Sequence, residues 1–185
     1  MKAAAWAGAV AMACLVPALG QPAGHAHVHG KARMDVAIDS ASITLALDSP
    51  LESLLGFERA PRSSAERERV QALVSALRAG TAFRIDPAAG CRLRAVTLDS
   101  PPLGLGPAAP GAGASASSDE HADLDGSFEF DCTAAARAGF IELPLFGLSS
   151  HLHEVDVQVA TPRGQFARTL TPAAARLVLH AGEGR

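Results

Sequence analysis

The sequence predicts an α+β domain in which an antiparallel β-sheet packs against one main amphipathic helix. Two observations lead to this fold class. Short segments in which apolar and polar residues alternate recur along the chain, and one segment, residues 63–80, has strong helical periodicity. Alternation with a period of two indicates a strand that buries one face. Many such strands around one helix favour an antiparallel sheet with one covered face.

The first two predicted strands, at 33–39 and 42–49, form a hairpin. Their apolar residues occupy every second position: Met34, Val36 and Ile38 in the first strand, and Ile43, Leu45 and Leu47 in the second. The stretch "DSAS" between them consists of turn-forming residues, so the two strands are expected to pair directly. The apolar segment 50–61 that follows is predicted to be irregular.

The helix predicted at 63–80 begins with a capping box. Ser63 and Glu66 have the Ser-x-x-Glu spacing in which each side chain bonds the backbone N–H of the other residue. An apolar stripe follows at helical spacing and consists of Val70, Leu73, Val74 and Leu77. Gly80 is expected to end the helix, and the charged residues 66–69 are expected to form a solvated face.

Five further strands are predicted after the helix. They span residues 91–98, 125–132, 141–146, 154–160 and 164–171. The stretch "TPRG" joins the last two strands as a hairpin turn. Residues 100–118 are rich in Pro, Gly, Ala and Ser, a composition typical of a flexible loop. The predicted organisation is a single α+β domain over residues 21–185.

Residues 1–20 have the features of a secretory signal peptide. Lys2 precedes an apolar run over 3–16 that is too short to span a bilayer, and the stretch "ALG" is a small-x-small cleavage motif. We expect cleavage after Gly20, although a cut after Ala26 satisfies the same rule. The mature chain is then an exported protein without a membrane-inserted segment.

The composition argues against several classes of protein. The chain has 16 Lys and Arg against 19 Asp and Glu and no polybasic cluster, which argues against a nucleic-acid partner. It has one tryptophan and no tyrosine, so aromatic platforms for sugars or bases are not expected. It contains no Gly-x-Ser-x-Gly, His-Glu-x-x-His or phosphate-binding glycine motif. We therefore expect that the protein is not an enzyme.

Two cysteines remain once the signal peptide is removed. Cys14 leaves with the signal, whereas Cys91 and Cys132 form an even pair in an exported chain. A disulfide between them is the expected state in an oxidising compartment. Two buried free thiols, or a Cys–His metal pair, are the alternatives.

Three histidines, His25, His27 and His29, alternate in the stretch "GHAHVHGKA". Residues two apart in an extended chain point to the same side, and neutral imidazole is a good ligand for zinc, copper and nickel. Three alternate histidines alone rarely complete a zinc tetrahedron, so a second segment should supply further ligands. A solvated N-terminal tail is the alternative interpretation.

The stretch "DEHADLD" at 119–125 is the natural source of the remaining ligands, because it offers Glu120, His121 and Asp123 at the end of the predicted loop. Imidazole and carboxylate groups both bind zinc. The pair His151 and His153 is interpreted instead as surface residues in a connection between elements.

A different cleavage position would favour a different metal. A cut after Ala26 would leave His27-Val28-His29 at the new N-terminus. A free amino group, the intervening amides and an imidazole at the third position form a square-planar site, which suits Cu(II) or Ni(II) better than zinc.

Five sequence blocks carry a resemblance to a known family. In chain order they are "HVHGKARMDVAID", "SPLESLLGFERAP", "GCRL", "HADLDGSFEFDC" and "HEVDVQVATPRGQ". With these blocks the chain resembles the ZrgA-like family of exported zinc-binding proteins, which is periplasmic and associated with zinc acquisition. The resemblance places His27, His29 and His121 on the family's histidine positions, and Cys91 and Cys132 on its paired cysteines.

The chain departs from the family pattern in two places. Family members often carry a loop rich in histidine and acidic residues before the "HAD" block, but residues 100–118 contain no histidine. Arg59 stands where the family often has a histidine. The resemblance therefore implies a compact zinc site rather than a high-capacity loop.

These observations together predict a periplasmic zinc-binding protein that captures or buffers zinc and supports zinc uptake. The predicted ligands are His27 and His29, then His121, with Asp123 or Glu120 as a fourth and His25 as the most expendable. The expected metal is Zn2+, with Cu2+ as the alternative, and the implied partner is a zinc uptake transporter or its binding protein. A copper-handling protein and a periplasmic interaction module that binds no metal are the alternative functions.

Overall fold

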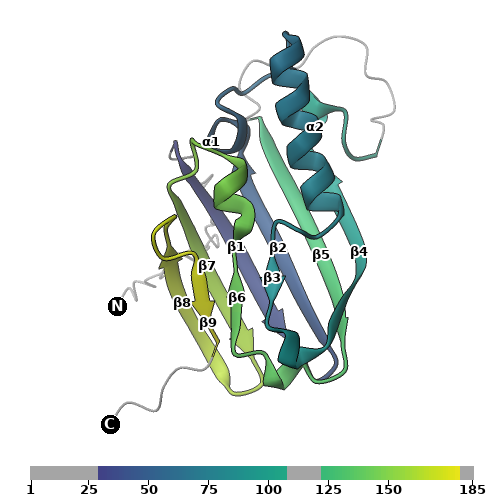
Figure 1. Ribbon diagram of the computed structural model, residues 1–185, viewed down its shortest axis with the longest axis vertical. Coiled ribbons are helices and arrows are strands. Elements are labelled where there is room, and N and C mark those ends of the chain that lie inside the picture. The colour runs from purple at the N-terminus through teal and green to yellow at the C-terminus, as the bar shows by residue number, and fades with distance from the viewer. Residues whose placement is uncertain (1–28, 108–121, 180–185) are drawn as a thin grey trace, which may run out of the picture.

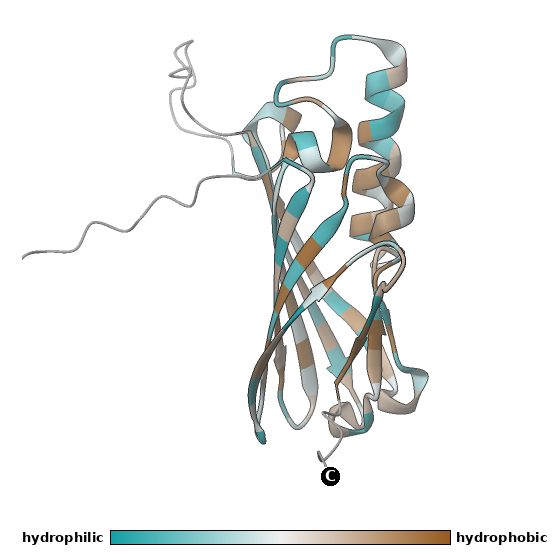
Figure 2. Cartoon of the chain, turned by 90° about the vertical axis from the view of Figure 1, so that its left-hand side faces the viewer, coloured by the Kyte–Doolittle hydropathy of each residue, from teal (hydrophilic) through white to brown (hydrophobic). Residues whose placement is uncertain are grey.

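A computed structural model describes residues 29–107 and 122–179 of the chain. It contains a six-stranded sheet with the strand order β4-β5-β2-β1-β7-β8 and a three-stranded sheet with the order β3-β6-β9 (Figure 1). Figure 2 shows the large sheet as one layer, with α2 and the small sheet on one of its faces. Within these two ranges, no helix is long and apolar enough to cross a membrane.

The large sheet is antiparallel except for one pair of strands. It consists of β1 (Lys31–Ile38), β2 (Ser42–Pro50), β4 (Cys91–Asp99), β5 (Asp123–Cys132), β7 (Glu154–Thr161) and β8 (Gly164–Leu170). β1 and β7 pair in parallel, with Lys31 opposite Glu154, and the other neighbours pair antiparallel. The predicted α+β class is confirmed. The parallel pair was not predicted, and it brings the start of β1 beside the start of β7.

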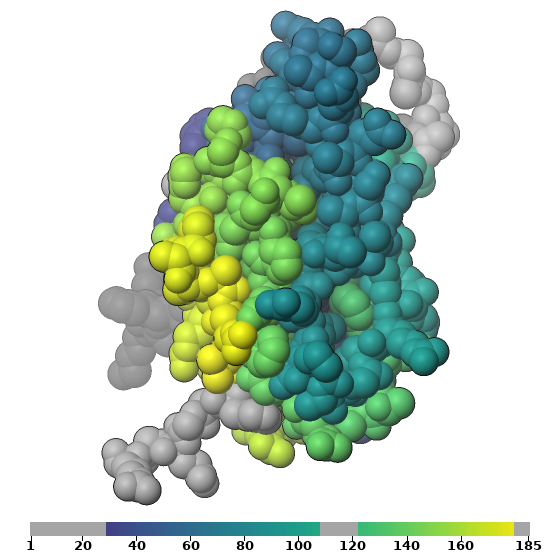
Figure 3. Space-filling model, in the orientation of Figure 1, coloured from purple at the N-terminus to yellow at the C-terminus, as the bar shows by residue number. Residues whose placement is uncertain are grey.

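Alternate residues of the predicted strands form the core. β1 and β2 are the predicted hairpin, closed by a 2.9 Å hydrogen bond from the Asp39 N–H to the Ser42 carbonyl. Met34, Leu45 and Phe128 are fully buried on the covered face of the sheet. Figure 3 shows α2 and the segments after β5 packed over this face, so that most of β1 and β2 is hidden.

Two helices follow β2, namely α1 (Leu51–Leu55) and α2 (Ser64–Arg78). The segment 50–61, predicted to be irregular, thus contains one helical turn. Leu51, Leu54 and Leu55 are buried, and Gly56 ends the turn with a φ of 81°. A five-residue helix is too short for a helical period to appear in the sequence.

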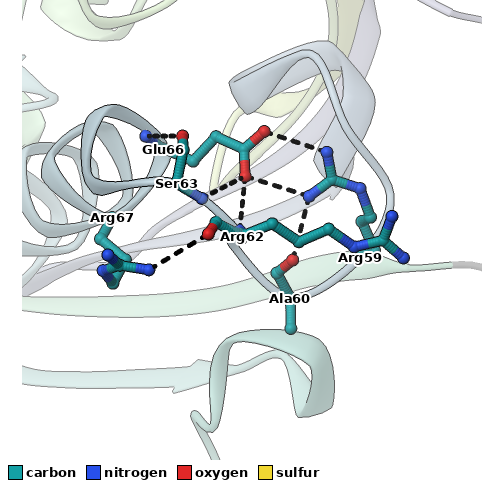
Figure 4. A network of polar contacts seen from close by, with 6 residues as sticks. All are labelled: Arg59, Ala60, Arg62, Ser63, Glu66 and Arg67. Carbon is teal, nitrogen blue, oxygen red and sulfur yellow. Dashed lines mark hydrogen bonds and ion pairs between the residues drawn. The ribbon is translucent and has the colours of Figure 1, made fainter.

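The capping box predicted for α2 is confirmed. Ser63 Oγ accepts a 3.1 Å hydrogen bond from the Glu66 N–H, and the Glu66 carboxylate accepts one from the Ser63 N–H. The predicted stripe faces the core, with Leu73 and Leu77 buried. Glu66 is less solvated than predicted, because its carboxylate also accepts hydrogen bonds from Arg59 (Figure 4).

The small sheet corrects one predicted strand. It consists of β3 (Arg84–Ile85), β6 (Phe140–Glu142) and β9 (Arg176–Val178). The strand predicted at 141–146 stops at Glu142, and a 3-10 helix runs over Pro144–Leu148. Proline has no N–H to donate to a neighbouring strand, which explains the early stop.

Cys91 and Cys132 form the predicted disulfide, so the free-thiol and Cys–His alternatives are wrong. The two cysteines lie directly opposite each other on β4 and β5. The predicted loop at 100–118 begins with a 3-10 turn over Pro101–Leu103. Its residues 108–118, like the predicted signal peptide at 1–20, lie outside the described residues.

Candidate metal centre

The start of β1 is held in place by the segment that precedes β7. The Gly30 carbonyl accepts hydrogen bonds from the N–H groups of His153 (2.8 Å) and Glu154 (3.1 Å). Gly30 has a φ of 78°, and a Cβ at this position would lie 2.9 Å from Cδ2 of His153. The positive φ and the close Cβ contact both favour glycine at this position. The two hydrogen bonds to its carbonyl hold the backbone next to His29 in place.

His29 contacts a carboxylate from α1. Its Nδ1 lies 3.0 Å from Oε2 of Glu52, and the side chains are 75% and 26% exposed, respectively. Oε2 itself is buried and receives no hydrogen bond of good geometry from the described residues. The distance is short enough for a hydrogen bond. Glu52 was not among the predicted site residues, because nothing in the spacing of "SPLESLLGFERAP" marks it.

The start of β5 meets the same turn of α1. The Leu51 N–H donates a 2.7 Å hydrogen bond to the Ala122 carbonyl, and Asp123 is paired with Pro50. The pairing of Arg33 with Asp48 places Lys31 level with Pro50. Since neighbouring strands are about 4.8 Å apart, the starts of β1 and β5 are separated by roughly 10 Å, with β2 and α1 between them.

We call this end of the large sheet the histidine edge and define it by His29, Gly30, Glu52, Ala122 and His153. Of the predicted ligands, the structure places His29 on this edge and half-buried Asp123 at the start of β5 beside it. His25, His27, Glu120 and His121 lie outside the described residues. In the sequence, His27 precedes His29 by two positions and His121 directly precedes Ala122.

The described residues do not form a metal site by themselves. Within residues 29–107 and 122–179, no group of three or more His, Cys, Asp or Glu side chains could hold a metal ion. His29 and Glu52 are the pair that lies in direct contact on the histidine edge. The predicted ligand set combines His29 and Asp123 with residues outside the described ranges, so it stays a prediction.

His151 and His153 lie in a connection between elements, as predicted, and this connection leads to the histidine edge. His153 is exposed beside Gly30, and His151 is half-buried with Nε2 2.6 Å from where a Cβ of Gly56 would be. The Ser149 hydroxyl donates to the Ser53 carbonyl of α1 and accepts from the His151 N–H. This segment thus ties α1 to the start of β7, and its two histidine rings lie close to Gly56 and Gly30.

A hollow of about 750 Å³, lined by both acidic and basic side chains, lies next to this edge on the open face of the sheet, and a cluster of aspartates borders it. Asp125 on β5 is directly opposite Asp48 on β2 and Asp99 on β4. Burial raises the pKa of Asp125 above its usual value of 3.8, and the neighbouring carboxylates of Asp48, Asp123 and Asp99 raise it further. Sequence reasoning missed this cluster, since its members come from three separate strands.

The family comparison agrees with the sequence resemblance. A family model described as "ZrgA family zinc uptake protein" matches residues 26–179, which include the histidine edge and both sheets. No curated protein sequence matches the chain.

Proposed function

The chain belongs to the ZrgA family of zinc uptake proteins, and on that premise we propose that it is a periplasmic protein that binds Zn2+. It would capture or buffer the ion and support its transfer to an uptake transporter or to that transporter's binding protein. The Zn2+ ion is the cargo of the protein, and no catalytic step is proposed.

The observation that carries this proposal is the position of the two strand starts. β1 and β5 both begin at the histidine edge and both contact the first turn of α1, through the His29–Glu52 contact and the Leu51–Ala122 hydrogen bond. In the sequence, His27 comes four positions before β1 and His121 two positions before β5. The strand starts to which the two predicted ligand groups are joined are themselves roughly two strand spacings apart.

The donor set suits zinc. We propose His27, His29 and His121 as ligands, with Asp123 or Glu120 as the fourth and His25 as an auxiliary donor. Three imidazoles and one carboxylate can form the tetrahedral site that Zn2+ prefers. Because zinc binds the neutral imidazole, protons compete with the metal, and affinity should fall below about pH 6.

Two properties of the chain support export to the periplasm. The Cys91–Cys132 disulfide is typical of an oxidising compartment, and residues 1–20 have the composition of a signal peptide. N-terminal sequencing of the mature protein from a periplasmic fraction tests this part. A mature chain that begins at His27 would redirect the proposal from zinc to Cu(II).

Chelator competition with Zn2+ tests the binding site, on mature protein purified without a metal resin. We expect His27→Ala, His29→Ala and His121→Ala each to weaken binding. His180→Ala is the matched control, because this histidine lies near the C-terminus and belongs to neither ligand group. Unchanged affinity in a combined His27→Ala/His29→Ala variant would refute the N-terminal ligands. A wild-type protein without micromolar affinity for zinc would favour the interaction module that binds no metal.

A further inference from the structure

We propose that Glu52 is a positioning residue for zinc binding, whose carboxylate holds the His29 imidazole with its proton on Nδ1 and leaves Nε2 as the ligand atom. The inference rests on the proposed function, since it describes how one of the proposed ligands is prepared for the ion. It pairs one proposed ligand, His29, with a residue from α1 that lies in contact with it.

The first step is that a buried oxygen of Glu52 needs a hydrogen-bond donor. Glu52 Oε2 is buried, and no hydrogen bond of good geometry reaches it from the described residues. Buried acceptors are almost always paired with a donor. His29 Nδ1 is 3.0 Å away, which is within hydrogen-bond distance of this oxygen. A neutral imidazole carries one proton, so placing it on Nδ1 leaves Nε2 with a free lone pair.

The second step separates the roles of the two side chains. The His29 side chain is 75% exposed, whereas that of Glu52 is 26% exposed with Oε2 buried. An incoming ion can therefore reach the imidazole without rearrangement of the edge, but it cannot reach Oε2. Histidine ligands of zinc commonly donate their second ring N–H to a carboxylate, which fixes the tautomer and the ring orientation.

The third step is the rigidity of the turn that carries Glu52. Leu51, Leu54 and Leu55 on the same turn are buried in the core. The Glu52 carbonyl accepts a 2.8 Å hydrogen bond from the Gly56 N–H, and the Leu51 N–H is bonded to Ala122. The carboxylate is thus presented from a packed element, as a positioning group must be.

Zinc affinity of single and double variants tests the proposal. Loss of such a partner typically costs about 10–100-fold in metal affinity, and we expect a loss in this range for Glu52→Ala. Glu52→Gln keeps an oxygen acceptor on a side chain of the same shape, so its loss of zinc affinity should be smaller. Glu58→Gln, at an exposed glutamate close in sequence, is the matched control and should stay within about twofold. In a His29→Ala background, Glu52→Ala should add little, because the two residues act as one unit.

The tautomer of His29 gives a readout that a purely structural role would not change. Long-range 1H–15N correlation spectra of the metal-free protein should show His29 protonated on Nδ1 in the wild type. In Glu52→Ala the proton should shift toward Nε2, while Glu58→Gln should leave the spectrum unchanged. Circular dichroism establishes whether the variants remain folded. If Glu52→Ala does not fold, the same spectra and affinities are measured on Glu52→Gln.

The outcomes distinguish this inference from the proposed function. If the wild type binds no zinc, the proposed function fails, and the tautomer of His29 still reports on the role of Glu52. If His29→Ala weakens binding but neither Glu52 variant does, the proposed function survives and the inference about Glu52 is wrong. A wild-type His29 protonated on Nε2 would also overturn it.

Discussion

The guanidinium of Arg59 donates two hydrogen bonds to the carboxylate of Glu66, at 3.1 and 2.9 Å, and so ties the segment after α1 to the first turn of α2 (Figure 4). Arg59 also lies 5.2 Å from the centre of the Phe57 ring. In the sequence, Arg59 is notable only because related proteins often have a histidine at this position. The structure gives Arg59 a role in packing instead.

We predict that Glu66→Gln destabilises the protein at neutral pH but much less at pH 3. The hydrogen bonds from Arg59, followed by the one from the Arg62 N–H, lower the pKa of Glu66 from 4.5 to about 2. A lowered folded-state pKa stabilises the fold above pH 4.5, and this contribution is lost as the pH falls from about 4.5 toward 2. Urea unfolding at pH 7 and pH 3 measures the difference. Glu68→Gln, at an exposed neighbour, is the control, and an equal loss at both pH values would contradict the prediction.

The local parts of the fold could be predicted because their signals lie within a few residues of sequence. Met34 and Leu45 belong to alternating strands, and Ser63 with Glu66 forms a four-residue motif. In contrast, the parallel pairing of Lys31 with Glu154 joins residues 123 positions apart. No periodicity encodes that pairing.

The candidate site could be predicted only in part for the same reason. The alternating histidines predict metal ligands from their spacing alone, which is why His29 is a candidate. Glu52 is distinguished by a contact that exists only after α1 packs against β1. Its neighbours Leu51 and Leu54 are apolar and its segment is short, so α1 itself was taken for irregular chain. Sequence reasoning therefore identifies candidate ligands that cluster along the chain, and it misses Glu52, whose contact with His29 arises only from the fold.

We predict that the double substitution Cys91→Ser/Cys132→Ser lowers the free energy of unfolding by roughly 4 kcal/mol. The disulfide closes a loop with a sequence separation of 41, and loop-closure entropy gives a value of that size. Urea unfolding of the oxidised wild type and the variant measures it. Zinc affinity under native conditions should change less than about twofold, because the disulfide lies at the opposite end of β5 from the histidine edge. A large loss of zinc binding in a folded variant would contradict this separation.

We predict that Asp125→Asn stabilises the protein at pH 7 by about 0.5 kcal/mol, the scale of surface charge interactions. Burial and three neighbouring carboxylates raise the pKa of Asp125 above 3.8. A raised folded-state pKa means that the fold favours the neutral form, so stability is lost as the pH rises through the folded-state pKa. The gain should vanish below the unfolded-state pKa near 3.8, and the part that comes from repulsion should shrink in high salt. Thermal unfolding of the wild type and Asp125→Asn across a range of pH measures this gain. If Asp125→Asn destabilises the protein at pH 7, Asp125 makes a favourable contact instead.

We predict that Gly30→Ala destabilises the protein by about 1–2 kcal/mol, the cost of a side chain in left-handed backbone, and also weakens zinc binding. The φ of Gly30 is 78°, and the new Cβ would lie 2.9 Å from Cδ2 of His153 and 3.1 Å from the His151 carbonyl oxygen. The contact with the His151 carbonyl is with backbone, so we expect its relief to shift the chain next to His29 relative to Glu52. Gly147→Ala is the matched control, since a Cβ there meets no atom within 4 Å. Adding His153→Ala to Gly30→Ala should recover the part of the loss that comes from the ring contact but not the part due to φ. If Gly30→Ala lowers stability while zinc affinity stays at the wild-type value, the start of β1 does not set the position of the ligand.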